Sequence, residues 1–160
     1  MDKKIILGGV IGIFAILCVG GYYTLGLKST NIIPNTTLNA IPASQNETEI
    51  RLSSSDLSTT AKFYSYDSKG VTIRYFAVKD SQGNVHVAFD ACDVCYTAKK
   101  GYKQVGDVMQ CLNCDREFAI TSIGSENTAG GCWPSYLPMM INGNDVVIKI
   151  SDLDAKSFMF

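Results

Sequence analysis

The chain has few charged residues and almost no histidine. Of its 160 residues only 18% are Asp, Glu, Lys or Arg, the formal net charge is -1, and His86 is the single histidine. A charge near zero without a basic stripe makes nucleic acid a poor partner, and we expect none. With one histidine, no Ser/His/acid set and no phosphate-binding loop, the sequence offers little for acid–base catalysis. We therefore expect an electron carrier or a binding module rather than an enzyme.

Charge is absent altogether from the segment Ile5–Leu27. A helix of that length spans about 34 Å, enough to cross a hydrocarbon core of about 30 Å. We expect residues 1–27 to form an N-terminal membrane anchor, a single transmembrane helix in contact with lipid. Lys3 and Lys4 favour a cytoplasmic N-terminus, so the rest of the chain is expected outside the cytoplasm. A signal peptide cleaved near residues 19–21 is the alternative.

The next segment, residues 28–46, is rich in Asn, Thr, Ser and Pro and shows no periodicity. Such a composition is typical of an extended tether, so we interpret residues 28–46 as an extracytoplasmic linker. Asn35 and Asn46 lie in N-glycosylation acceptor triplets, which agrees with a position outside the cytoplasm. We expect the remainder, residues 47–160, to be a cysteine-rich metal-binding β domain.

The pattern in this domain is typical of β-strands. Segments 62–66 and 71–79 are rich in aromatic and β-branched residues, and the intervening Asp-Ser-Lys-Gly turn predicts a hairpin. In segment 85–89 apolar residues alternate with others, which predicts a strand buried on one face. Further strands are expected at residues 49–52, 108–110, 117–120 and 146–150. The sequence predicts a mainly β domain, either a small β-sandwich or a zinc-ribbon-like fold.

Five of the six cysteines lie in this domain: Cys92, Cys95, Cys111, Cys114 and Cys132. The first four form a C-x2-C-x15-C-x2-C pattern, which is typical of a metal site. Each C-x-x-C turn, here called a knuckle, brings two sulfurs to one side, and two knuckles close four thiolates around an ion. Sulfur ligation suits zinc, iron and an iron–sulfur centre alike. Disulfides, as in a thiol–disulfide oxidoreductase, are the alternative, although five thiols cannot all pair.

Cys132 lies in the stretch GGCWP. It is a candidate for an additional metal ligand, for a replacement of one of the four, or for a resolving thiol; a buried free cysteine is the alternative. We interpret His86 as a solvated strand residue. Asp90, Asp93 and Asp115 flank the thiolates, and we expect them to face solvent or to cap turns.

The residues around the cysteines resemble a known family. The run FDACDVCYTAKKGYKQVGDVMQCLNCDREFAI, followed by GGCWPS, is similar to the FtrD-like domain of membrane iron–sulfur proteins. This resemblance implies an iron or iron–sulfur centre bound by Cys92, Cys95, Cys111 and Cys114, with Cys132 as a further candidate ligand. The family is associated with membrane iron transport and electron transfer, which implies a membrane redox or transport partner.

The layout of the domain also resembles Rieske-type domains, which bind a two-iron cluster with Cys and His in each knuckle. Both histidine positions are absent here, so the likeness implies a similar β fold with the site at its tip rather than a Rieske centre. The main hypothesis is an outward-facing protein that carries electrons or assists metal transport. The alternative is a structural-zinc domain that binds a membrane partner such as a permease.

Overall fold

The structure is a computed structural model that describes residues 44–45 and 48–160. The strands are β1 (Ser44–Gln45), β2 (Glu49–Ser53), β3 (Lys62–Ser68), β4 (Val71–Lys79), β5 (Val85–Cys92), β6 (Tyr102–Val105), β7 (Val108–Cys111), β8 (Glu117–Ala119), β9 (Pro134–Tyr136), β10 (Met140–Asn142) and β11 (Asp145–Lys149). The helical elements are α1 (Ile150–Asp154) and the 3-10 turns η1 (Ser54–Asp56), η2 (Tyr96–Ala98), η3 (Ile120–Ser122) and η4 (Ser157–Met159).

The predicted membrane anchor at residues 1–27 and nearly all of the predicted linker at residues 28–46 lie outside the described residues. Within residues 44–45 and 48–160, no helix combines the length and the apolar composition needed to cross a membrane. The anchor, its orientation and the linker therefore stay predictions.

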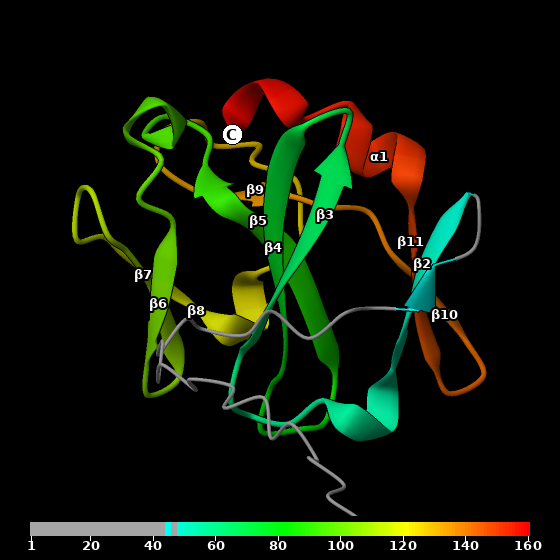
Figure 1. Ribbon diagram of the computed structural model, residues 1–160. Helices are drawn as coiled ribbons and strands as arrows, with labels where there is room; N and C mark the ends of the chain where they lie inside the picture. The colour runs from blue at the N-terminus through cyan, green and yellow to red at the C-terminus, as the bar shows by residue number, and fades with distance from the viewer. Residues whose placement is uncertain (1–43, 46–47) are drawn as a thin grey trace, which may run out of the picture. The chain divides into compact units, whose positions relative to one another are not determined.

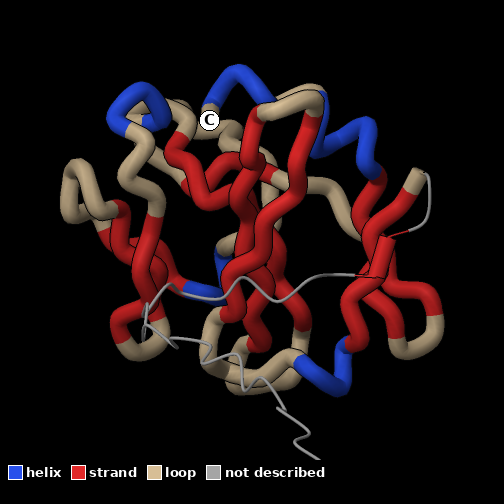
Figure 2. Tube along the Cα trace, viewed as in Figure 1, coloured by secondary structure: helices blue, strands red, loops and turns tan. Residues whose placement is uncertain are grey.

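The strands form three antiparallel sheets (Figures 1 and 2). Their strand orders are β1-β2-β11-β10, β3-β4-β5-β9 and β6-β7-β8. In Figure 1 the second sheet lies between the other two, so it is the central layer of the domain. The prediction of a mainly β domain is confirmed.

The hairpin of β3 and β4 shows how the local sequence determines the turn. Ser68 pairs with Val71, so only Lys69 and Gly70 connect the two strands. Both residues have positive φ, 52° and 88°, which is the conformation that a two-residue hairpin turn requires. The backbone N–H of Gly70 donates to Oδ1 of Asp67 at 3.1 Å and closes the turn. The predicted hairpin is confirmed, with β3 two residues longer than expected.

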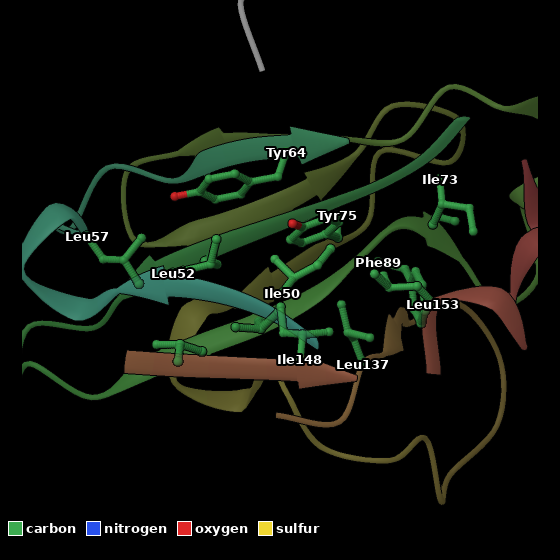
Figure 3. Close-up of a cluster of buried hydrophobic side chains, with 14 of the residues drawn as sticks. Ile50, Leu52, Leu57, Tyr64, Ile73, Tyr75, Phe89, Leu137, Ile148 and Leu153 are labelled. Atoms are coloured by element: carbon green, nitrogen blue, oxygen red, sulfur yellow. The ribbon is translucent and has the colours of Figure 1, made fainter. Parts of the chain in front are cut away.

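One hydrophobic core, which we call the first core, fills the space between the central sheet and the sheet that contains β2 and β11. Ile50 and Leu52 of β2 and Ile148 of β11 point toward Tyr75 of β4 (Figure 3). The stacked rings of Tyr64 and Tyr75, with centroids 5.4 Å apart, extend this contact along the central sheet. Burial of these side chains is the main force that holds the two sheets together.

The other face of the central sheet packs on the sheet of β6, β7 and β8. The buried residues of this second core are Phe76, Val78, Ala88, Cys92, Tyr102, Met109, Cys111, Phe118, Ile120 and Ile123. Because the central sheet is covered on both faces, every residue from Val87 to Cys92 is buried. The prediction that the strand at 85–89 is buried on one face is therefore wrong. Both faces of β5 carry core residues. Its even-numbered residues, the last of which is Cys92, lie on the face toward the second core.

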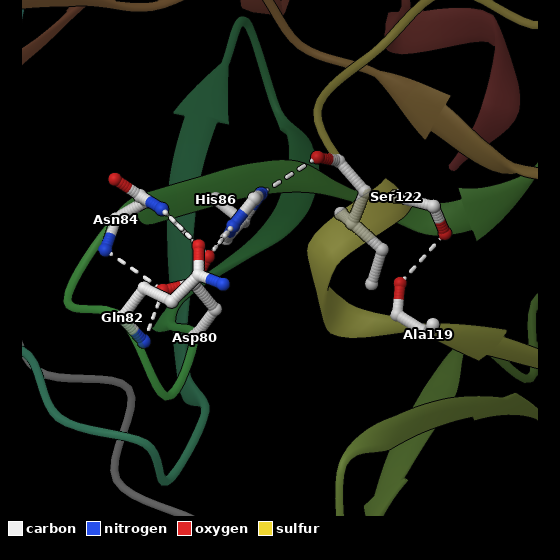
Figure 4. Close-up of polar contacts among 7 residues, drawn as sticks. Asp80, Gln82, Asn84, His86, Ala119 and Ser122 are labelled. Carbon is white, nitrogen blue, oxygen red and sulfur yellow. Dashed lines mark hydrogen bonds and ion pairs between the residues drawn. The ribbon is translucent and has the colours of Figure 1, made fainter.

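His86 is a hydrogen-bonded residue rather than a solvated one, and its side chain is only 14% exposed. Its Nδ1 lies 2.9 Å from the carbonyl oxygen of Ile123, and its Nε2 lies 3.1 Å from Oδ2 of Asp80 (Figure 4). The Asp80 carboxylate is an acceptor, so Nε2 of His86 is the donor in that bond. The interaction connects the start of β5 to the segment that follows η3.

Asp80 is the centre of this polar network. Its carboxylate accepts hydrogen bonds from the side chain and backbone N–H of Asn84, from the backbone N–H of Gln82 and from His86. The side-chain bond from Asn84, together with the others, holds the pKa of the Asp80 carboxyl well below its usual range, although burial works in the opposite direction. The ionised form of Asp80 is therefore part of the folded structure.

We expect Asp80→Asn to destabilise the protein at neutral pH and to reduce its sensitivity to acid. Because the pKa of Asp80 is lower in the folded state, its stabilising contribution is present above the unfolded pKa of about 3.9 and is lost as the pH falls below it. Urea unfolding between about pH 2 and pH 5 measures this effect, and the wild type should lose stability more steeply than the variant. Asp107→Asn, at an exposed carboxylate, is the control. Equal slopes for wild type and Asp80→Asn would contradict the interpretation.

Candidate metal centre

Three segments bring the five cysteines to one edge of the second core. Cys92 is the last residue of β5 and Cys111 the last residue of β7, so each knuckle begins where a strand ends. Cys132 lies two residues before β9, whose Pro134 pairs with Cys92. Both knuckles therefore lie at strand ends, and the structure places Cys132 beside them.

The five sulfur atoms form one cluster, here called the cysteine cluster. Sγ of Cys132 lies 3.5 Å from Sγ of Cys95 and 3.5 Å from Sγ of Cys114. The sulfurs of Cys92, Cys95 and Cys132 all lie within 4.8 Å of one another, and so do those of Cys95, Cys111 and Cys114. Cys95 belongs to both sets and joins them. All five side chains are free thiols.

The cluster is closed on its inner side and open on its outer side. Cys92 and Cys111 are only 3% and 1% exposed, and both belong to the second core. The other three cysteines are half-buried. A metal held here would be shielded from water by the core and would still be reachable from the surface.

The two knuckles present the same pattern of backbone donors to their first sulfur. The sulfur of Cys92 accepts hydrogen bonds from the N–H groups two and three residues further on, at Val94 and Cys95. The sulfur of Cys111 accepts from the equivalent groups of Asn113 and Cys114. Such donors stabilise a thiolate, which is the form that binds metal. In both knuckles these N–H groups therefore favour the charged form of the first sulfur.

Electrostatics within the cluster favour a bound cation. Burial raises the pKa of the Cys92 thiol, but its hydrogen bonds outweigh burial and lower the pKa to about 7. Burial raises the pKa of Cys111 to about 11, and the charge of Cys92 adds to this effect. Burial also raises the pKa of Cys132 far above its usual range, with hydrogen bonding by Cys114 and Cys95 as a further cause. The Cys92 thiol thus ionises readily, whereas ionisation of Cys111 and Cys132 is unfavourable. The positive charge of a metal ion offsets this cost and favours the thiolate form of all three. The donor set fits a thiolate-bound metal centre.

A buried carboxylate holds the first knuckle in position. Asp90, only 8% exposed, accepts hydrogen bonds from the backbone N–H of Tyr102 at 2.6 Å and from Nε of Arg74 at 3.1 Å. Burial raises its pKa, and these two bonds act against that rise. Nη2 of Arg74 also donates to the carbonyl of Lys99, in the loop after the first knuckle. The expectation that Asp90 faces solvent or caps a turn is wrong, because β6 covers this face of β5.

The loop before β6 joins the two knuckles. The carbonyl oxygen of Gly101 accepts from the N–H of Leu112, the residue after Cys111, at 2.9 Å. Gly101 has φ +73°, and its α-carbon lies so close to the Asp90 carboxylate that no side chain fits. The KKGY run quoted above contains both Gly101 and Tyr102, and that run is the signal in the sequence for these two supporting residues.

The Cys132 segment is attached to the first knuckle by the backbone and by Asp93. The N–H of Asp93 donates to the carbonyl of Trp133 at 3.0 Å, and its carboxylate accepts from Nδ2 of Asn127 at 3.0 Å. Trp133 packs edge to face on Phe118 of the second core, with centroids 5.3 Å apart. These contacts explain why Cys132 lies beside the other four cysteines.

The comparisons with known proteins agree with the site. Neither a curated protein nor a solved structure matches the chain. A family model described as "Membrane iron-sulfur containing protein FtrD-like" matches residues 57–160. The matched region contains all five cysteines of the cluster and most of the described domain. The chain therefore belongs to the FtrD-like family of membrane iron–sulfur containing proteins.

Proposed function

We propose that this protein holds an iron or iron–sulfur centre and uses it for electron transfer at the outer face of a membrane, in support of metal transport. Cys92, Cys95, Cys111 and Cys114 are the proposed ligands, and Cys132 is an additional one. The observation that carries the proposal is the convergence of five free thiols from three segments on one edge of a buried core.

The surroundings of the cysteine cluster suit a redox centre. Thiolate-bound iron supplies one-electron chemistry, with a potential set by charge, by hydrogen bonds to sulfur and by exposure. The buried side chains of Cys92 and Cys111 exclude water, and the backbone N–H groups of Val94 and Asn113 act to lower the pKa of these two thiols. Half-buried Cys95 and Cys114 leave a short path from the surface for an electron. In each cycle the protein accepts one electron from a reduced membrane partner and passes it to an oxidised one.

The expected anchor and linker complete this proposal. A single helix at residues 1–27, in contact with lipid, and a linker at residues 28–46 would hold the domain outside the cytoplasm and close to the membrane. Such a tether raises the effective concentration of the domain near a membrane redox or transport partner. The Rieske-like arrangement and the zinc-ribbon alternative stay predictions about the fold.

Reversible reduction tests the electron-carrier function directly. The full chain, purified without oxygen, is titrated through a range of potentials while its visible spectrum is recorded. We expect thiolate-to-iron charge-transfer bands that disappear when the sample is reduced and return when the same sample is reoxidised. A centre that shows no such reversible change would contradict the electron-carrier function.

A single zinc ion is the second candidate, and the sulfur spacing is compatible with it, as it is with a single iron ion. Four thiolates at about 2.3 Å from one ion lie roughly 3.8 Å apart from one another. Sγ of Cys132 lies 3.5 Å from two other sulfurs, which is close to that spacing. Zinc has no redox chemistry, so the domain would then serve as a folded module that binds a membrane partner such as a permease. The absence of visible colour in the metal-loaded protein would favour this candidate.

The role of Cys132 is tested by Cys132→Ser. Because its sulfur touches those of Cys95 and Cys114, we expect the substitution to weaken metal binding, by roughly 10-fold to 100-fold. Competition with a coloured chelator measures the affinity. Ser135→Ala, at a buried hydroxyl in the following strand, is the control and should leave the affinity unchanged. A Cys132→Ser protein with wild-type affinity and stoichiometry would show that this cysteine is not part of the centre.

A further inference from the structure

Tyr102 lies beside the cysteine cluster in a fixed orientation. It begins β6 and pairs with Cys111. Its ring, 4% exposed, packs between those of Phe76 and Phe118, with centroids 6.2 Å and 6.1 Å away. Its backbone N–H is held by Asp90. The position of the phenol hydroxyl is therefore determined by the core and not by solvent.

The hydroxyl of Tyr102 lacks a well-formed hydrogen bond. Among the described residues, three buried side-chain oxygens have no partner of acceptable geometry: those of Tyr75, Tyr102 and Ser135. A buried polar group without a partner costs about 1–3 kcal/mol, so such a group calls for an explanation. Of the three residues, only Tyr102 belongs to the second core together with Cys92 and Cys111, and its hydroxyl is one of the groups that lower the pKa of the Cys92 thiol. The thiol sulfur of free Cys92 is a weak acceptor, which leaves the hydroxyl poorly satisfied in the metal-free protein.

We propose that Tyr102 donates a hydrogen bond from its hydroxyl to the Cys92 sulfur when that sulfur is a metal-bound thiolate, and that Tyr102 is thereby a positioning residue of the centre. This inference rests on one part of the proposed function, the binding of a metal by Cys92.

Charge explains why the bond forms in the loaded protein. A thiolate sulfur is a far better acceptor than a thiol, and a bond from a neutral donor to a charged acceptor is roughly twice as strong as a neutral one. The bond fixes the Cys92 sulfur and stabilises its negative charge. Since reduction adds an electron to the centre, a donor at the sulfur favours the reduced state and raises the potential. The backbone N–H groups of Val94 and Cys95 act on the same sulfur in the same direction, because they too favour its charged form.

Tyr102→Phe tests the proposal, because it removes the hydroxyl and keeps the ring that Phe76 and Phe118 contact. Tyr75→Phe is the matched control: it removes another unpartnered buried hydroxyl, in the first core and away from the sulfurs. The full chain is loaded with Co²⁺, whose thiolate bands report the ligands whatever the native metal is. We expect Tyr102→Phe to bind Co²⁺ at least about 10-fold more weakly than wild type and to shift these bands, while Tyr75→Phe changes neither.

The iron-loaded protein allows a second measurement, the reduction potential, which a hydroxyl with only a structural role would not change. At a fixed ambient potential we expect the ratio of reduced to oxidised centre to be about 10-fold lower in Tyr102→Phe, which equals 59 mV for one electron. A Tyr102→Phe protein that matches Tyr75→Phe in Co²⁺ affinity and in potential would overturn the proposal. If the wild-type iron centre cannot be reduced and reoxidised, the electron-carrier function fails instead, and the Co²⁺ affinities alone decide on Tyr102.

Discussion

Replacement of Cys92 or Cys111 by serine should weaken metal binding more than any other single substitution. Structural thiolate sites are worth about 10–16 kcal/mol in small zinc domains, or roughly 2.5–4 kcal/mol for each of four ligands. The loss of one ligand therefore weakens binding by roughly a hundredfold to a thousandfold. Because both sulfurs are almost fully buried and receive two backbone N–H donors each, a serine hydroxyl cannot replace them as charged ligands. Metal stoichiometry after gel filtration and the affinity from chelator competition measure the effect.

Met109→Leu is the matched control for this experiment. Met109 is fully buried in β7, two residues before Cys111, and leucine removes its sulfur while it conserves the volume. We expect the control to bind metal as wild type does. If Cys92→Ser and Cys111→Ser both retained a full equivalent with wild-type affinity, the assignment of the two knuckles as ligands would be wrong.

Gly101→Ala should destabilise the domain by about 3 kcal/mol and weaken metal binding as well. A β-carbon at this position would lie 2.6 Å from Cγ of Asp90, and still closer to a carboxylate oxygen. Asp90 would have to move away from Tyr102 and Arg74, which leaves a buried carboxylate without its hydrogen bonds. The positive φ adds strain for any residue with a β-carbon. Thermal unfolding and metal affinity of the same preparation measure both effects.

Gly106→Ala separates the steric effect from the backbone effect. Gly106 also has a positive φ, +57°, but no atom lies within 4 Å of the position that a β-carbon would take. We expect a loss of about 1 kcal/mol from backbone strain and no change in metal affinity. Equal effects of the two substitutions would show that the contact between Gly101 and Asp90 does not support the centre.

The cysteine knuckles and several of the strands were within reach of sequence analysis because their signals are local. Strands β2, β7, β8 and β11 begin and end within one residue of the predicted positions. Two-residue periodicity and turn chemistry determine such elements. The remaining strands carry weaker signals: β9 begins at a proline, β10 has no buried residue, and β6 has only one buried residue among four. Their pairing depends on the rest of the fold.

The supporting residues of the site could not be predicted because they depend on contacts between distant segments. The sequence predicts that Asp90 faces solvent or caps a turn, whereas the sheet of β6, β7 and β8 packs on this side of β5 and buries it. The position of Cys132 was open for the same reason, since β9 brings it to the knuckles from 18 residues beyond Cys114. Tyr102 carries no separate signal apart from its place in the KKGY run that resembles the family.

The measurement that tests the central claim most directly is the metal content of the full chain, purified without oxygen and before any metal is added, together with its visible spectrum. We expect iron bound to the cysteine cluster, with thiolate charge-transfer bands that disappear in Cys111→Ser and remain in Met109→Leu. One equivalent of zinc and a colourless protein would contradict an electron-transfer centre and would identify the cluster as a structural zinc site.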